Sequence, residues 1–175
     1  SAGWTTSQEL NTSWSDRGTG YNFFDGTNWG MAPLNRLESS RGGWPSIIAM
    51  GSGKEASITH NTDNAHINMT HRSTTGTGSW TEQNISSLDP STGIYRDMIW
   101  NRSAVGGLNK ETIHMIAVTA SSNFGGLPFN ALDGALVYYR SQDEGVTWDI
   151  QDMQLPGMDT SLFDAITILL ASLIT

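Results

Sequence analysis

The sequence predicts an all-β fold made of four-stranded antiparallel sheets. Two compositional features favour this fold: 19 of the 175 residues are Gly, and only 15% of residues are charged. Such a composition suits short strands joined by many tight turns. The third observation is that strand-length apolar runs, separated by turns rich in Gly, Asn and Ser, occur in the same order twice. At this length we expect one domain with a sizeable core.

The first set of four predicted strands precedes residue 86. Its strands are 46–50, 55–60, 66–71 and 80–85. Pro45 suits a strand start, because proline has no N–H to donate within a sheet. Residues 66–71 alternate polar and apolar side chains, as a strand with one face in the core does. Three tryptophans are expected to pack inside a preceding unit: Trp4, Trp14 and Trp29.

The second set has the same order. Its predicted strands are 95–100, 112–118, 135–139 and 148–153. Residues 112–118 are mostly apolar on both faces, which is typical of a strand between packed layers. Residues 121–134 are rich in Ser, Asn, Gly and Pro, and predict a long loop.

Residues 141–148 read S-Q-D-E-G-V-T-W and form the most specific pattern in the chain. The Asp143 carboxylate can accept hydrogen bonds from the backbone of the turn that it begins. Gly145 can take the positive φ that a tight hairpin needs, and Trp148 supplies a large apolar face over the turn. The residues at the fixed positions of the pattern are Ser141, Asp143, Gly145, Thr147 and Trp148.

This pattern resembles the Asp-box, or BNR repeat, of sialidase-like β-propellers. A degenerate copy occupies residues 73–80, where Thr75 stands in place of Asp and Thr77 in place of Gly. Residues 24–29 keep only a turn and a Trp. Irregular copies at intervals of roughly 40 to 70 residues are typical of propeller blades with loop insertions. The alternative is a set of unrelated Gly- and Thr-rich hairpins.

The resemblance implies a partial β-propeller, a fragment of a larger ring, since two blades and part of a third do not close one. The implied units are 1–40 as outer strands of a preceding blade, 41–90 as a blade with the degenerate box, 91–155 as a blade with the intact box, and 156–175 as an atypical apolar tail. The uncharged end of this tail is too short to span a bilayer. A short helix capped by Ser161, a buried strand and a shifted reading frame all remain open for it.

Charge and residue usage exclude several classes of function. The formal net charge of −8 disfavours nucleic acid and anionic membrane surfaces as partners. There is no Cys, and no His or Asp spacing matches a metal motif, so neither a metal nor a cofactor is expected. Residues 16–26 and 41–46 also resemble exported propeller proteins of Bacteroidetes-type bacteria, which implies an extracellular or cell-surface location.

A sialidase-type active site would need three arginines that clamp a carboxylate, an Asp acid/base, and a Tyr nucleophile paired with Glu. Arg41 and Arg96 are the best placed arginines, although Arg41 is equally a surface residue and Arg96 can pair with Asp97. The full catalytic set cannot be assembled. The candidate ligand-binding residues are Arg41, Trp44, Glu55, Arg96 and Asp97. The competing interpretation of Glu55 is a solvated strand end, and that of Trp44 is core packing.

The preferred hypothesis is a non-catalytic binding or display module of an exported propeller, which acts through loops on one face of the ring. Its expected partners are a glycan or a cell-surface protein, together with the remaining blades or another copy of the chain at the open sheet edges. One alternative is a glycoside hydrolase of the sialidase type. Another is a structural surface-layer domain without a ligand.

Overall fold

The fold is all-β, as the composition predicts. A computed structural model describes residues 1–63, 66–89, 92–93 and 95–163. The strands are β1 (Ala2–Thr6), β2 (Gly18–Asn22), β3 (Gly42–Ala49), β4 (Glu55–Asn61), β5 (Ile67–Arg72), β6 (Thr81–Ile85), β7 (Ser87–Leu88), β8 (Tyr95–Arg96), β9 (Met98–Gly106), β10 (Thr112–Thr119), β11 (Leu136–Ser141) and β12 (Ile150–Gln154). The described helical structure is one 3-10 turn, η1 (Ser122–Phe124), and no described helix has the length and apolar character needed to cross a membrane.

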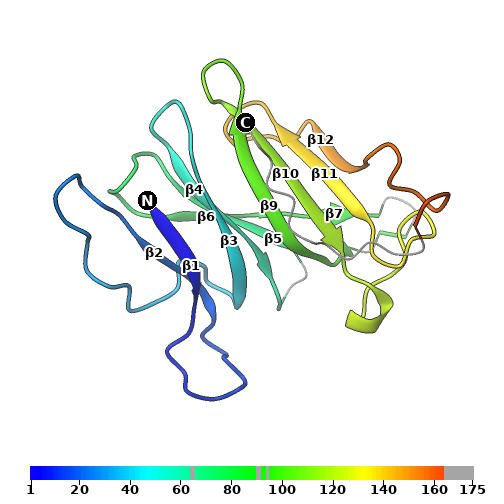
Figure 1. Cartoon of the computed structure of the whole chain (residues 1–175), viewed down its shortest axis with the longest axis horizontal. Coiled ribbons are helices and arrows are strands. Elements are labelled where there is room, and N and C mark those ends of the chain that lie inside the picture. Colours follow the sequence, from blue (N-terminus) through cyan, green and yellow to red (C-terminus); the bar gives the residue numbers. More distant parts are fainter. Residues whose placement is uncertain (64–65, 90–91, 94, 164–175) are drawn as a thin grey trace.

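Two four-stranded antiparallel sheets make up most of the molecule, and each follows the chain from one strand to the next. The first sheet has the order β3-β4-β5-β6, and the second has the order β9-β10-β11-β12. The two-stranded sheets β1-β2 and β7-β8 accompany them. In Figure 1 the pair β1-β2 lies on the left, the first sheet in the middle and the second sheet on the right.

The two central strands of the first sheet, β4 and β5, are buried on both faces because the sheet lies between the two other layers. Every residue of β4 is buried. On one side, the Thr19 hydroxyl of β2 lies 3.4 Å from that of Ser57. On the other side, the Asn101 side chain of β9 donates a hydrogen bond of 2.8 Å to the carbonyl oxygen of Ile58. The two large sheets share one apolar core. Its fully buried members include Ile58, Ile67, Met69, Ile113, Met115 and Tyr139.

The structure differs from the sequence-based expectations at several strand starts, among them β12, which begins at Ile150 and not at Trp148. Residues 95–100 do not form one strand: Tyr95–Arg96 pairs with Ser87–Leu88, and β9 begins at Met98 and runs on to Gly106. β3 begins at Gly42, before Pro45, and the register of its pairing with β4 shifts between Gly43 and Ser46. The tail prediction falls largely on residues 164–175, which lie outside the described residues.

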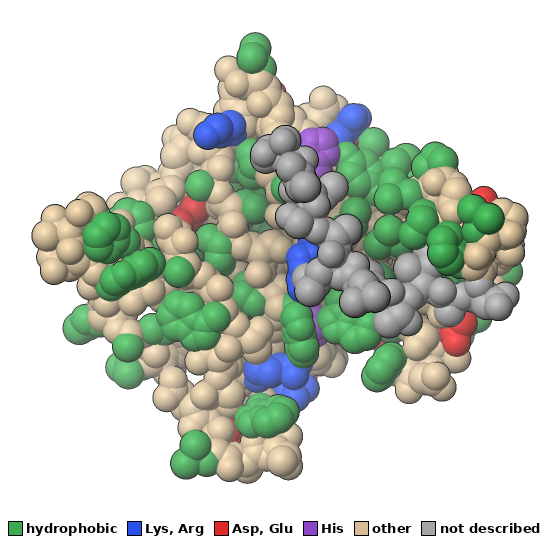
Figure 2. All heavy atoms as spheres, in the orientation of Figure 1, with side chains coloured by type: hydrophobic (Ala, Val, Ile, Leu, Met, Phe, Trp, Pro, Cys, Tyr) green, Lys and Arg blue, Asp and Glu red, His purple; other side chains and the backbone are tan. Residues whose placement is uncertain are grey.

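The tryptophans of residues 1–40 are not packed inside a unit. Trp4, Trp14 and Trp29 keep 40%, 44% and 57% of their surface exposed. Figure 2 shows hydrophobic side chains at the left end of the molecule, where the loop after β2 lies. The cause is that β1 and β2 form only a two-stranded sheet, which is too small to cover large side chains on its outer side.

Candidate functional site

Residues 141–148, whose pattern resembles an Asp-box and which we call the intact box, form the turn between the third and fourth strands of the second sheet. Asp143 Oδ1 accepts a hydrogen bond of 2.8 Å from the backbone nitrogen of Thr147, and its Oδ2 accepts one of 2.6 Å from the Thr147 hydroxyl. Ser141 Oγ donates to Asp143 and accepts from the backbone nitrogen of Gly145, both at 2.8 Å. Burial raises the pKa of Asp143, but the bonds from Thr147 and Ser141 outweigh it and leave this pKa below its ordinary value.

The intact box also contacts the preceding sheet. Gly145 has a φ of +86°, and a Cβ there would lie 2.6 Å from the methyl carbon of Met69 in β5. Gln83 of β6 donates a hydrogen bond of 2.6 Å to the carbonyl oxygen of Gly145. Trp148 lies edge-on to Tyr139, with ring centroids 6.3 Å apart. The box therefore closes a hairpin and fastens the second sheet to the first.

The degenerate box occupies the same place in the first sheet, between β5 and β6. Gly76 has a φ of +81°, and a Cβ there would lie 2.5 Å from the ring of Phe23, just after β2. The backbone nitrogen of Thr75 donates to the carbonyl oxygen of Gly53, in the turn between β3 and β4. Glu144 of the intact box donates in the same way to Glu111, which lies between β9 and β10. Each turn is thus bonded to the turn before the second strand of its own sheet, although the donor lies one position earlier in the degenerate box than in the intact box.

Residues 24–29 form a smaller turn after β2. Asp25 Oδ1 accepts hydrogen bonds from the backbone nitrogens of Thr27 and Asn28, at 2.7 and 2.8 Å. The rings of Phe24 and Trp29 lie 5.4 Å apart across the turn. An aspartate therefore holds this turn too, although the bonds span fewer residues than in the intact box.

Glu55 is not a solvated strand end. It lies in a buried polar network at the end of the first sheet that carries the degenerate box. Its side chain is fully buried and forms an ion pair of 2.5 Å with Arg72. Tyr21 donates a hydrogen bond of 2.8 Å to Glu55, and Ser1 donates one of 2.7 Å. The Arg72 guanidinium lies 4.3 Å from the ring centroid of Trp80. Burial raises the pKa of Glu55, but its hydrogen bonds outweigh this effect and lower it.

The two candidate arginines do not meet. Arg41 donates from its guanidinium to the carbonyl oxygens of Trp14 and Ser13, at 2.9 and 3.2 Å. Arg96 forms an ion pair of 2.6 Å with Asp89, and its second terminal nitrogen lies 3.9 Å from Asp152. Among the described residues, Arg96 forms no ion pair with Asp97, the pairing that the sequence offered as an alternative; Asp89 takes that place.

Two tryptophans occupy equivalent places in the first strands of the two sheets. Trp44 is the third residue of β3 and has a φ of +54°, and Trp100 is the third residue of β9 and has a φ of +51°. Each lies where the register with the next strand shifts. A positive φ is unfavourable for a bulky L-residue, and such strain concentrates at functional positions. The sequence indicates Trp44 as a candidate ligand-binding residue, whereas it indicates Trp100 only as a strand residue.

These tryptophans line one groove of about 330 Å³ between the starts of β3 and β9. Its other main walls are Arg17, His60, Asp97 and Phe124. The His60 ring stacks on Trp44 at 4.8 Å, and the Arg17 guanidinium lies 5.0 Å from the same indole. Phe124, which keeps 66% of its surface exposed, stands edge-on to Trp100 at 6.3 Å. The lining is mostly aromatic and apolar, with a few charged groups at its margins, which is typical of small-ligand sites.

The electrostatics of the groove differ between its two sides. Burial, followed by the charges of Arg17, Arg102 and Arg41, lowers the pKa of His60 to about 4. This imidazole is therefore neutral at pH 7, and its Nδ1 accepts a hydrogen bond of 3.3 Å from the backbone nitrogen of Trp100. Burial raises the pKa of Asp97, opposed only by His66. No described residue donates a hydrogen bond to the Asp97 carboxylate.

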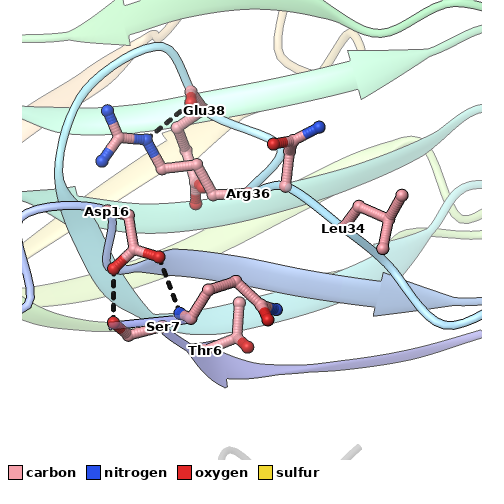
Figure 3. Close-up of a pocket in the computed structure, with 8 residues that line it drawn as sticks. Thr6, Ser7, Asp16, Leu34, Arg36 and Glu38 are labelled. Carbon is pink, nitrogen blue, oxygen red and sulfur yellow. Dashed lines mark hydrogen bonds between the residues drawn. The ribbon is translucent and has the colours of Figure 1, made fainter. Parts of the chain in front are cut away.

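A second hollow lies beside the end of β1 and is polar (Figure 3). Asp16 accepts hydrogen bonds from the Ser7 hydroxyl and the backbone nitrogen of Gln8. Arg36 donates to four backbone carbonyl oxygens around it. Glu38 accepts from the backbone nitrogen and hydroxyl of Thr19. Since the charged groups of this hollow are engaged in holding loops, it offers few groups to a ligand.

Sequence reasoning found two residues of the groove and missed the others. Trp44 and Asp97 were candidates, whereas Arg17, Trp100 and Phe124 were not. Phe124 follows β10 in a loop that had no distinguishing pattern. The repeated position of a Trp near the start of two successive first strands is the signal that would have indicated Trp100. Within the described part of the chain, no three His, Asp or Glu side chains gather as metal ligands.

No model of a known protein family matches the chain, and no curated protein matches it.

Proposed function

We propose that this chain is a non-catalytic binding module of an exported, sialidase-like propeller, and that it holds a glycan in the groove of Trp44, Trp100 and Phe124. The observation that carries this proposal is the left-handed φ of Trp44 and of Trp100 at matching places in β3 and β9. Holding a bulky residue in that conformation costs roughly 1–3 kcal/mol. The protein bears this cost at two residues that line the same groove. This favours the interpretation that the two indoles form a binding surface.

The propeller part of the proposal rests on repetition. Both large sheets run through four strands in chain order, and each has its box turn between the third and fourth strand. Each turn places a glycine of positive φ against the preceding layer: Gly145 against Met69, and Gly76 against Phe23. A stack in which every unit contacts the previous one in the same way is the arrangement that radial repetition requires. Exported location follows from the sequence resemblance alone.

The alternative, a sialidase-type hydrolase, has one observation in its favour. Tyr21 and Glu55 form a hydrogen-bonded Tyr–Glu pair, with Arg72 2.6 Å from the Tyr21 hydroxyl. However, burial and Glu55 raise the pKa of Tyr21, and a nucleophilic phenol needs the opposite. The pair also lies at the box end, and the guanidinium groups of Arg41 and Arg96 bind protein oxygens. These features favour binding over catalysis.

Retention on a glycan array, compared among three proteins, tests the proposed function. The wild type is expected to bind a subset of glycans, and Trp100→Gly is expected to lose that binding. Trp14→Gly is the matched control, because Trp14 is also exposed and has a φ of +42°, yet does not line the groove. Equal loss in both variants, or binding by neither the wild type nor the variants, contradicts the proposal. Release of a fluorophore from a sialoside would favour the hydrolase instead.

A further inference from the structure

Asp97 is the carboxylate of the groove, and its electrostatic neighbour among the described residues is His66, which opposes the effect of burial on its pKa without pairing with it. Its backbone carbonyl oxygen accepts a hydrogen bond of 2.7 Å from Ala120, which fixes the chain at the start of β9. The adjacent Arg96 turns to Asp89 and Asp152. Asp97 forms no ion pair with a described residue. A partly buried carboxylate without a partner is costly, so a complementary ligand would be cationic at this point.

The aromatic walls beside Asp97 suit the same kind of ligand. The rings of Trp100 and Phe124 meet at 77°, with centroids 6.3 Å apart, and form a corner. An ammonium group within about 6 Å of an aromatic centroid is attracted by the negative face of the ring. The indole and phenyl faces also suit the apolar C–H face of a sugar ring. A carboxylate next to such a corner therefore combines two attractions for one ligand cation.

The opposite end of the groove has the reverse character. There Arg17 lies over Trp44, and its Nε donates a hydrogen bond of 2.9 Å to the carbonyl oxygen of Gly42. The indole of Trp44 thus already has an internal cation and the neutral His60 ring against it. A second cation is unfavourable beside Arg17. The cationic part of a ligand is consequently confined to the side of Asp97, Trp100 and Phe124.

We propose that the groove binds an amino sugar of a glycan, with the ring against Trp100 and Phe124 and its protonated amine on the Asp97 carboxylate. This inference rests on the proposed glycan-binding function and specifies its ligand class. It differs from the anionic sugar that the sialidase resemblance implies, because the unpaired charge in the groove is negative. The overall net charge of −8 favours cationic ligands in the same direction.

Isothermal titration with two matched oligosaccharides tests this assignment. The probes are a glucosamine oligomer and the N-acetylglucosamine oligomer of the same length, at about pH 6.5, where an Asp carboxylate is ionised. The wild type is expected to bind the glucosamine oligomer about tenfold more tightly, since one charge-assisted hydrogen bond is of that order. Asp97→Asn is expected to remove the preference, so that the ratio of the two affinities falls to about one.

The control carboxylate is Asp133. It lies near the other side of the same aromatic pair, but it is already hydrogen-bonded to the Ser122 backbone at 2.6 Å and hydroxyl at 2.7 Å. Asp133→Asn is expected to keep the preference. Equal wild-type affinity for both oligomers would overturn the amine assignment and leave glycan binding standing. Binding of neither oligomer would overturn both the amine assignment and the glycan-binding function. Choline serves as a cation without a sugar ring: if it alone binds, and binding requires Asp97, the ligand is a cation but not an amino sugar.

Discussion

The backbone nitrogen of Gly76 donates a hydrogen bond of 2.9 Å to the carboxylate of Glu55. This contact gives the degenerate box a carboxylate acceptor in the absence of its own aspartate. In the intact box the acceptor is Asp143, two residues before Gly145; in the degenerate box it comes from the start of β4. The degenerate turn is therefore held by a carboxylate from another strand, whereas Thr75 stands at its own aspartate position.

Removing the charge of Glu55 should destabilise the protein strongly. Glu55→Gln leaves the buried Arg72 guanidinium without its partner, which typically costs about 3–5 kcal/mol of unfolding free energy. Urea denaturation followed by tryptophan fluorescence measures this cost. The matched control is Asp149→Asn, which breaks an ion pair of 2.6 Å whose side chains are about a third exposed. The control should change the midpoint little, and equal midpoints for the two variants would contradict the role of burial.

Asp143→Asn should lower stability by about 1–3 kcal/mol at neutral pH, because the amide cannot accept both hydrogen bonds from Thr147. The pKa of Asp143 is lower in the folded protein than its ordinary 3.8. Its contribution is therefore present above the unfolded pKa and is lost as the pH falls through the folded pKa. Melting curves at a series of pH values should show the wild type and variant converging below the ordinary pKa.

The control for the box aspartate is Asp159→Asn. Asp159 holds an exposed turn through Ser161 and does not fasten one sheet to another. It should have a much smaller effect on the melting temperature. A difference between wild type and Asp143→Asn that stays constant down to the lowest pH would contradict the proposed origin of the stabilisation.

Gly145→Ala should cost more than backbone strain alone. A left-handed φ is unfavourable for Ala by roughly 1–2 kcal/mol, and the added methyl group must also displace Met69, for a further 1–3 kcal/mol or so. Gly78→Ala separates the two effects, because Gly78 has a φ of +92° with open space where the Cβ would lie. Denaturation midpoints should fall further for Gly145→Ala. Equal midpoints would show that the box does not press on β5.

At a tryptophan with a positive φ, the Gly variant should be more stable than the Ala variant, which reverses the usual order of stability. At Trp100 the Gly variant should be more stable than the Ala variant by roughly 1 kcal/mol, since only glycine adopts the left-handed φ without strain. At Trp4, a strand residue of β1 that lacks a positive φ, Ala should be the more stable. Thermal unfolding of the four variants measures both differences, and the same order at both sites would contradict the strain.

The strand pattern could be predicted from the sequence because the strands and turns carry local signals. Alternation in 66–71, the two-sided apolar run in 112–118 and the pattern at 141–148 each lie within a few residues. The buried network of Glu55 could not be predicted, because its partners Arg72 and Tyr21 come together with it only through strand pairing and layer packing. The same limit applies to the groove, which Arg17, Asp97 and Phe124 join from three separate segments. The left-handed φ of Trp44 cannot be predicted from its residue type.

A crystal structure of the chain with a bound glucosamine oligomer tests the central claim most directly. We predict a sugar ring packed on the faces of Trp100 and Phe124, with its amine within hydrogen-bonding distance of the Asp97 carboxylate. Sugar density located away from the groove between β3 and β9, or Trp44 and Trp100 with ordinary negative φ, would contradict it.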